Sequence, residues 1–104
     1  MNVVTRFAPS PTGKLHIGGA RTAIINYLFA KKYSGKYLVR IEDTDKKRSS
    51  KEAIKAIHTG LNWLNVNSEF KIVYQSQNYN SHIKVANELL EKGFAYKCFL
   101  NSDE

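Results

Sequence analysis

The chain has 104 residues, of which 42% are hydrophobic and 12% aromatic, so a disordered chain is excluded and one folded domain is expected. Sixteen lysines and arginines oppose nine acidic residues, and the formal charge of +7 favours polyanionic partners such as nucleic acid, although a merely basic surface has the same balance. No apolar run is long enough to cross a membrane, the first residues lack the apolar stretch of a secretion signal, and a single cysteine excludes an internal disulfide. We therefore expect a cytoplasmic protein without membrane association.

The first 41 residues predict a strand, a turn, a helix and a second strand. Val3–Ala8 is a short apolar run that begins with β-branched residues, as buried strands do, and Pro9 stops it. From Ile17, apolar residues recur three and four positions apart until Ser34, which predicts a helix of about 18 residues. Tyr37–Ile41 supplies the second strand. This order predicts a right-handed βαβ unit and hence an α/β fold with a Rossmann-like parallel sheet flanked by helices.

The remaining residues predict further helices and a third strand. Ser49 and Glu52 have the spacing of a capping box at a helix start. Lys71–Tyr74 predicts a short strand, and Asn80 or Ser81 is expected to cap a helix that ends at Gly93. One face of the first of these helices carries Ala53, Ile54, Ile57, Leu61 and Leu64; residues 65–69 are expected to form a loop and residues 94–99 an extended segment.

The segment between the first strand and the first helix predicts a nucleotide-phosphate site. Its two prolines and Gly13 stop the strand and delay the helix, so that backbone N–H groups point outward at the helix N-terminus. Gly18 and Gly19 have no Cβ and would let a ligand approach the backbone. His16 would stand at the helix mouth, where a hydrogen-bond donor stabilises phosphate charge. A proline-rich turn that only caps a helix would have a similar composition.

Ligands of such sheets bind beyond the carboxyl ends of the strands, which places residues 8–19 and 42–48 on the same rim. The run Arg6-Phe-Ala-Pro-Ser-Pro-Thr-Gly-Lys-Leu-His-Ile-Gly-Gly19, followed by Arg40-Ile-Glu-Asp-Thr-Asp45, resembles the N-terminal part of glutamyl-tRNA synthetases, a family of class I aminoacyl-tRNA synthetases. His16–Gly19 is similar to the His-Ile-Gly-His signature of that class, with glycine in the fourth position, as is usual in the glutamyl branch. The resemblance continues through residues 74–76 and 93–98.

The resemblance implies that residues 1–78 form the first half of a class I synthetase catalytic domain and that residues 79–104 are the truncated start of the insertion that binds the tRNA acceptor end. It also implies ATP-dependent attachment of glutamate to tRNA(Glu) through a glutamyl-adenylate, by a monomer whose substrates are L-glutamate and ATP with Mg²⁺. Whether tRNA(Gln) is also charged stays open. Mg²⁺ arrives with ATP, so no protein ligand to a metal is expected.

Site residues follow by resemblance, position by position. His16 is the catalytic residue. Glutamate needs a guanidinium for its side-chain carboxylate and a carboxylate for its ammonium, and Arg6 and Glu42 fit these two needs. A structural interpretation stays open for each: Arg6 could pair with an acid of the fold, Ser10 could be a turn residue, and residues 42–45 could form a solvated loop or a helix cap. The implied positions are Arg6, Ser10 and Glu42 for glutamate, Ala8, His16, Gly18 and Gly19 for ATP, and Asp45 and Arg48 for a further contact with substrate or tRNA.

Three departures from the family pattern limit this interpretation. The second ATP-contacting signature, a Lys-Met-Ser-Lys-Ser-like loop, is absent, as is an anticodon-binding region, so we expect no aminoacylation by these 104 residues alone. Some relatives have Cys-x-Cys where this chain has Cys98 and Leu100, so zinc is not expected and Cys98 is interpreted as a partly buried, apolar-like residue. The chain ends where the insertion has barely begun. Two alternatives remain, a glutamyl-queuosine tRNA(Asp) synthetase and a noncatalytic module that binds tRNA or nucleotide.

Overall fold

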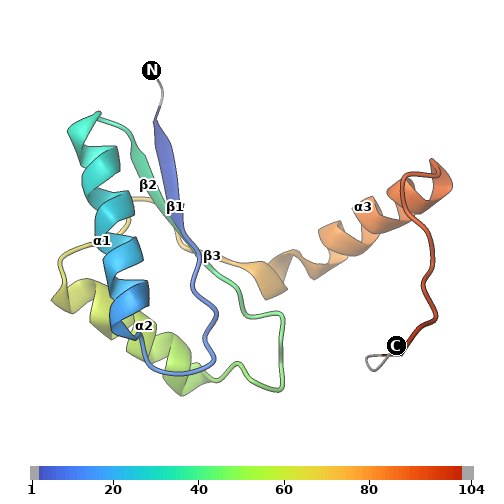
Figure 1. Ribbon diagram of the computed structural model, residues 1–104, viewed down its shortest axis with the longest axis horizontal. Coiled ribbons are helices and arrows are strands. Elements are labelled where there is room, and N and C mark those ends of the chain that lie inside the picture. The colour runs from blue at the N-terminus through green and yellow to red at the C-terminus, as the bar shows by residue number, and fades with distance from the viewer. Residues whose placement is uncertain (1–2, 102–104) are drawn as a thin grey trace.

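The computed structural model describes residues 3–101; residues 1–2 and 102–104, the outer ends of the predicted segments 1–78 and 79–104, lie outside it. Within residues 3–101, three strands form a sheet in the order β1-β2-β3, and both neighbouring pairs are parallel (Figure 1). The predicted α/β fold with a parallel sheet and flanking helices is therefore confirmed. The elements are β1 (Val4–Phe7), α1 (Ile17–Lys32), β2 (Lys36–Ile41), α2 (Lys51–Trp63), β3 (Val73–Tyr74), a 3₁₀ helix η1 (Gln75–Asn78) and α3 (Tyr79–Glu91).

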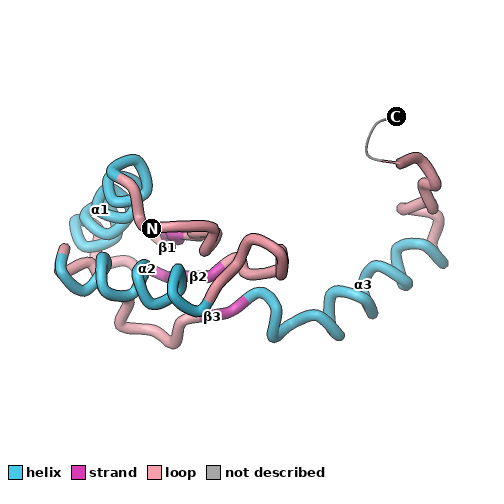
Figure 2. Tube along the Cα trace, turned by 90° about the horizontal axis from the view of Figure 1, so that it is seen from below, coloured by secondary structure: helices cyan, strands magenta, loops and turns pink. Residues whose placement is uncertain are grey.

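Helices α1 and α2 lie on the same face of the sheet (Figure 2). Strand β2 alternates strictly, with Tyr37, Val39 and Ile41 buried toward the helices, because successive side chains of a strand point to opposite faces. The apolar face predicted for α2 is confirmed, since its residues are buried or packed against the core. The core consists of Phe7, Ala23, Ala30, Tyr37, Val39, Ile41, Ile57, Leu61 and Val66.

The other face of the sheet carries charge at its carboxyl end. Arg6 is paired in register with Leu38, and Arg40 with Val73. Because side chains alternate between the two faces of a sheet, both arginines lie on the face opposite the buried residues that contact the helices. Their side chains are 45% and 37% exposed. This face, which α1 and α2 do not cover, is the one from which Arg6 and Arg40 reach the rim of the sheet.

Leu15 joins the first loop to both helices. A Cβ at Gly19 of α1 would lie 2.8 Å from Leu15 Cδ1, and a Cβ at Gly60 of α2 would lie 2.9 Å from Leu15 Cδ2. Both glycines therefore leave the space that the Leu15 side chain fills. Gly60 sits inside a helix, where glycine costs about 1 kcal/mol relative to alanine, and this packing accounts for its presence. The residue before His16 is thereby held between α1 and α2.

Two helices begin at residues other than those predicted. Ser50, and not Ser49, caps α2, because its Oγ accepts the N–H of Ala53 at 3.1 Å. The Ser49 N–H donates to the Asp45 carbonyl at 2.9 Å, so Ser49 belongs to the preceding turn. The prediction of a cap at residue 80 or 81 is also wrong: η1 runs directly into α3, with Asn78 at the N-cap position.

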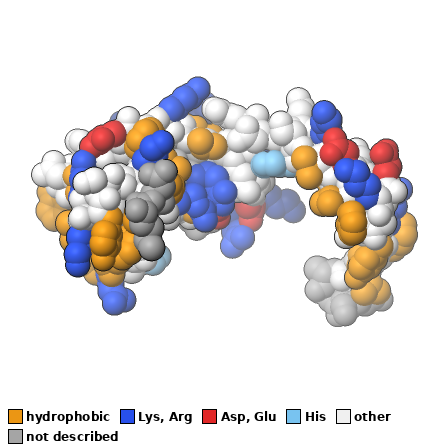
Figure 3. All heavy atoms as spheres, turned by 90° about the horizontal axis from the view of Figure 1, so that it is seen from above, with side chains coloured by type: hydrophobic (Ala, Val, Ile, Leu, Met, Phe, Trp, Pro, Cys, Tyr) orange, Lys and Arg blue, Asp and Glu red, His pale blue; other side chains and the backbone are white. Residues whose placement is uncertain are grey.

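Helix α3 projects from the body as an arm (Figures 1 and 2). None of its residues is buried, and hydrophobic side chains are exposed along it (Figure 3). Gly93, with a φ of 73°, ends the helix as predicted: its own N–H donates to the Leu90 carbonyl, and its left-handed conformation lets the next two N–H groups reach back to the Leu89 carbonyl. Residues 95–101 form neither helix nor strand. No helix within residues 3–101 is both long and apolar enough to cross a membrane.

Candidate functional site

Loops from all three strands meet at the carboxyl edge of the sheet. The Glu42 N–H donates to the Pro9 carbonyl at 2.9 Å, and the Ser50 N–H donates to the Pro11 carbonyl at 3.4 Å. These bonds join the loop after β1 to the loop after β2, so the prediction that residues 8–19 and 42–48 share a rim is confirmed. Parallel strands end on one edge, which is why segments far apart in the sequence lie together here.

Opposite charges meet at this edge. Glu42 Oε1 accepts from Arg6 Nη1 at 3.4 Å and from Arg40 Nη2 at 2.5 Å. Arg6 therefore pairs with an acid of the fold, which is the structural interpretation given above. The same pair places a guanidinium beside a carboxylate, and these are the two groups that an amino-acid ligand would require. Arg40 was not predicted. Its signal in the sequence is a charged residue inside the apolar run Tyr37–Ile41, and its Nε is buried without a hydrogen-bond partner within residues 3–101.

His16 is the N-cap of α1. Its Nδ1 accepts the N–H of Gly19 at 3.3 Å, and a Cβ at Gly18 would lie 3.1 Å from the imidazole ring, so the ring lies close to the first turn. The ring is nevertheless exposed. Because the first turn of α1 contains no acidic residue, the positive end of the helix dipole is not neutralised there. This arrangement suits an anionic group at the helix mouth.

The remaining predicted residues lie on the same two loops. Ala8 is partly buried directly after β1, and exposed Ser10 belongs to a turn in which its carbonyl accepts the Thr12 N–H at 2.9 Å. The Asp45 carboxylate accepts a hydrogen bond from Arg48 Nε at 2.6 Å and further hydrogen bonds from the backbone N–H groups of residues 47 and 48. These hydrogen bonds, the one from the Arg48 side chain first, lower the pKa of Asp45. Asp45 and Arg48 thus stabilise a turn on the rim and leave the guanidinium mostly exposed.

Acidic side chains at the rim are engaged with neighbours. Besides Glu42 and Asp45, Asp43 accepts hydrogen bonds from the backbone and side chain of Ser76. Within residues 3–101, no three His, Cys, Asp or Glu side chains gather as metal ligands would. The expectation of a partly buried Cys98 is wrong: it is exposed, since the segment after α3 packs against nothing that covers it.

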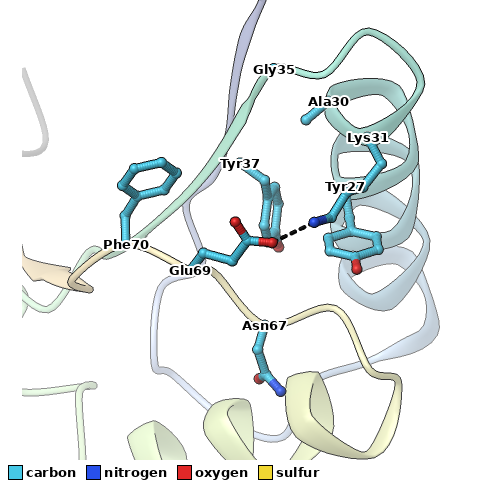
Figure 4. Close-up of a pocket in the computed structure, with 8 residues that line it drawn as sticks. All are labelled: Tyr27, Ala30, Lys31, Gly35, Tyr37, Asn67, Glu69 and Phe70. Carbon is cyan, nitrogen blue, oxygen red and sulfur yellow. Dashed lines mark hydrogen bonds and ion pairs between the residues drawn. The ribbon is translucent and has the colours of Figure 1, made fainter.

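Two hollows elsewhere contain neither Arg6 nor Glu42. An open, mostly apolar groove of about 720 Å³ runs between α1 and α2, and Leu15, Ile17 and Trp63 are among its lining residues. A cavity of about 20 Å³, room for one water molecule, lies between α1 and the loop before β3, where Lys31 donates to Glu69 (Figure 4). Burial raises the pKa of Tyr37, which lines this cavity, to about 12. The cavity is too small for a substrate.

Comparison with known proteins shows the family of the chain. Residues 2–104 match the family described as tRNA synthetases class I (E and Q), catalytic domain. The chain belongs to this family. It is 61% identical over 103 residues to glutamate–tRNA ligase 2 of Wolbachia sp. subsp. Brugia malayi and 56% identical over 103 residues to glutamate–tRNA ligase 1 of Erythrobacter litoralis. These alignments cover 99% of the chain but only 23% and 21% of the relatives.

Solved structures of family members have the same fold. A glutamate–tRNA ligase of Elizabethkingia meningosepticum, crystallised in complex with its amino acid, superposes with a TM-score of 0.80 at 35% identity over 88% of the chain. The glutamate–tRNA synthetase of Elizabethkingia anophelis gives a TM-score of 0.81. The chain covers 20% of each of these structures. It therefore corresponds to about a fifth of such an enzyme and carries three parallel strands with the fold of a class I catalytic domain.

Proposed function

We propose that this chain is the part of a glutamate–tRNA ligase that binds L-glutamate and the phosphates of ATP while glutamyl-adenylate forms. The observation that carries the proposal is the contact between Arg6 and Glu42 at 3.4 Å, from the ends of two neighbouring strands, on the rim that also holds the N-terminus of α1. A zwitterionic substrate with a second carboxylate needs both signs of charge within one small site. The reaction itself, attachment of glutamate to tRNA, is proposed from membership of the family.

In this proposal an oxygen of the α-carboxylate of glutamate attacks the α-phosphorus of ATP, and the bond from that phosphorus to pyrophosphate breaks. Arg6 binds the side-chain carboxylate of glutamate, Glu42 binds its ammonium group, and Ser10 completes the amino-acid site. His16 and the N–H groups at the start of α1 stabilise charge on the phosphate oxygens, next to Ala8, Gly18 and Gly19. Arg40 holds Glu42 when Arg6 turns to the ligand.

Mg²⁺ enters as part of the ATP complex, since the acidic side chains of the rim already have partners. The accepting tRNA is tRNA(Glu), with Asp45 and the exposed guanidinium of Arg48 close to where substrate and the tRNA end meet. We also propose that the arm from residue 79 begins the acceptor-binding insertion and that residues before it belong to the catalytic domain. The same proposal assigns the cytoplasm, where charged tRNA is used.

A chimeric enzyme tests the proposal. The matching 103 residues of the Wolbachia glutamate–tRNA ligase 2 are replaced by this chain, and glutamate-dependent ATP–pyrophosphate exchange is measured with tRNA(Glu) present. We expect exchange within about tenfold of the parent enzyme and a loss of at least tenfold for Glu42→Gln. A folded chimera with no exchange would favour a noncatalytic binding module instead. The separate 104-residue chain, as a control, is expected to charge no tRNA.

A further inference from the structure

Asp43 makes a bidentate contact that the proposed reaction does not use directly. Its Oδ1 accepts the backbone N–H of Ser76 at 2.8 Å, and its Oδ2 accepts the Ser76 hydroxyl at 2.6 Å. Asp43 follows the carboxyl end of β2, and Ser76 lies in η1 just after β3. Both bonds are partly buried and join residues 33 positions apart. We call this pair the Asp43–Ser76 clamp.

The clamp replaces backbone pairing that β3 is too short to provide. Strand β3 contacts β2 through only two register pairs, Arg40 with Val73 and Ile41 with Tyr74. The next residue of the β2 loop is Glu42, and beyond it the two loops are joined through the Asp43 side chain. Hydrogen bonds to an ionised carboxylate are about twice as strong as bonds between neutral groups. The clamp therefore fixes the loop after β2 where the ladder has ended.

The carboxylate of Asp43 is ionised at neutral pH, as this contact requires. Burial by itself would raise the pKa of Asp43, but hydrogen bonds from the Ser76 hydroxyl and N–H, with smaller backbone contributions, outweigh it, so the pKa lies below its ordinary value. A protonated carboxyl would lose one of its acceptor sites. The contact is thus a charge-assisted one over the ordinary range of pH.

Glu42 stands between two such attachments. On one side its own N–H donates to the Pro9 carbonyl at 2.9 Å, and on the other side the next residue is held by Ser76. Its side chain then reaches Arg6 and Arg40 on the uncovered face of the sheet. With its own N–H bonded and Asp43 held, the backbone of Glu42 cannot shift without disturbing these bonds, and a misplacement of about 1 Å at such a site can cost about 100-fold in rate.

We infer that Asp43 and Ser76 are positioning residues for the glutamate-binding carboxylate of Glu42. The inference rests on the proposed role of Glu42 as the group that binds the ammonium of glutamate. The clamp touches the amino-acid side of the rim, whereas His16 at the phosphate side is held by Gly19 and by Leu15 packing. Loss of the clamp therefore weakens binding of glutamate and leaves binding of ATP unchanged.

The chimeric enzyme described above separates these effects. For Asp43→Ala we expect the KM for glutamate to rise about tenfold and the KM for ATP to stay within about twofold. Ser76→Ala keeps the backbone bond to Oδ1 and is expected to raise the glutamate KM less, while the double variant is no worse than Asp43→Ala alone. Asp43→Asn still accepts the Ser76 N–H and should restore part of the binding.

Ser68→Ala is the matched control, because the Ser68 hydroxyl donates a partly buried hydrogen bond to the Tyr37 carbonyl, at the other end of β2. Its glutamate KM is expected to equal that of the parent. An equal rise for Ser68→Ala and Ser76→Ala, or a glutamate KM within twofold of the parent for both Asp43→Ala and Ser76→Ala, overturns the inference. If Asp43→Ala does not fold, Ser76→Ala decides. A Glu42→Gln variant with unchanged glutamate KM would instead show that the proposed function is wrong, and the inference with it.

Discussion

The two nitrogens of His16 can be tested separately. Nδ1 accepts the Gly19 N–H at 3.3 Å, so in the neutral ring the proton lies on Nε2, which is then a hydrogen-bond donor at the mouth of α1. His16→Asn keeps an oxygen that can cap the helix, because asparagine is among the best N-cap residues, but it has no donor at the position of Nε2. His16→Ala removes both the cap and the donor.

Each loss has its own magnitude. Loss of an N-cap costs about 0.5–2 kcal/mol of stability, so His16→Ala should lower the free energy of unfolding by about 1 kcal/mol, and His16→Asn by less than half of that. Loss of a donor to a developing charge costs about 2–4 kcal/mol of transition-state stabilisation. Both variants should therefore slow adenylate formation by more than tenfold, although His16→Asn loses less than half as much stability as His16→Ala.

Two assays measure these quantities. Urea unfolding of the 104-residue chain, followed by far-ultraviolet circular dichroism, gives the free energy of unfolding. Glutamate-dependent ATP–pyrophosphate exchange by the chimera, with tRNA present, gives the rate of adenylate formation. If His16→Asn exchanged at the rate of the parent, the donor at Nε2 would have no part in the reaction, and His16 would be a helix cap only.

Further predictions address binding, packing and pH. Arg6→Ala in the chimera should lower the ratio of kcat/KM for glutamate to that for glutamine, because the guanidinium distinguishes a carboxylate from an amide; an unchanged ratio would contradict its assignment. Gly60→Ala should stabilise the chain by about 1 kcal/mol in a Leu15→Ala background but by less in the parent, where the new Cβ would meet Leu15 at 2.9 Å, and urea unfolding of the four variants measures the difference. For Tyr37, the folded pKa of about 12 exceeds the ordinary tyrosine value of 10.0, so stability should be intact below pH 10 and fall as the pH rises toward 12. The urea midpoint followed across this range should fall less in Tyr37→Phe than in the parent.

Local signals in the sequence predicted the order of elements because each signal is complete within a short segment. Pro9 stops β1, the apolar spacing after Ile17 defines α1, and Gly93 at a φ of 73° ends α3. Signals that depend on neighbours were less informative. The spacing to Glu52 favoured Ser49 as the cap, but the hydrogen bond from the Ser49 N–H to the Asp45 carbonyl places Ser49 in the preceding turn and leaves capping to Ser50.

The site was predicted only in part, because some of its residues have local signals in the sequence and others do not. Residues on the two glycine- and charge-rich loops were identified from residue type and resemblance, and the parallel sheet explains why they share a rim. Ser76 was missed as a site residue because its importance lies in a contact with Asp43, 33 positions away in the sequence. Arg40 was missed because its contact with Glu42, two positions along the chain, depends on side-chain conformations that residue type alone does not give. Burial at Cys98 was wrongly expected because burial depends on what packs over a segment, which its own sequence does not contain.

The two glycines in the first turn of α1 illustrate how one residue type can satisfy two requirements. Gly18 and Gly19 were interpreted as places where a ligand approaches the backbone. Within the chain itself, the space beside Gly18 is bounded by the His16 ring at 3.1 Å, and the space beside Gly19 by Leu15 at 2.8 Å. A side chain at Gly18 would press on the His16 ring and one at Gly19 would require Leu15 to shift, so both glycines let His16 and Leu15 lie close to the start of α1 before any ligand binds. A ligand that reached the helix N-terminus would meet His16 already oriented, and this preorganisation is what stabilisation of charge at phosphate oxygens requires.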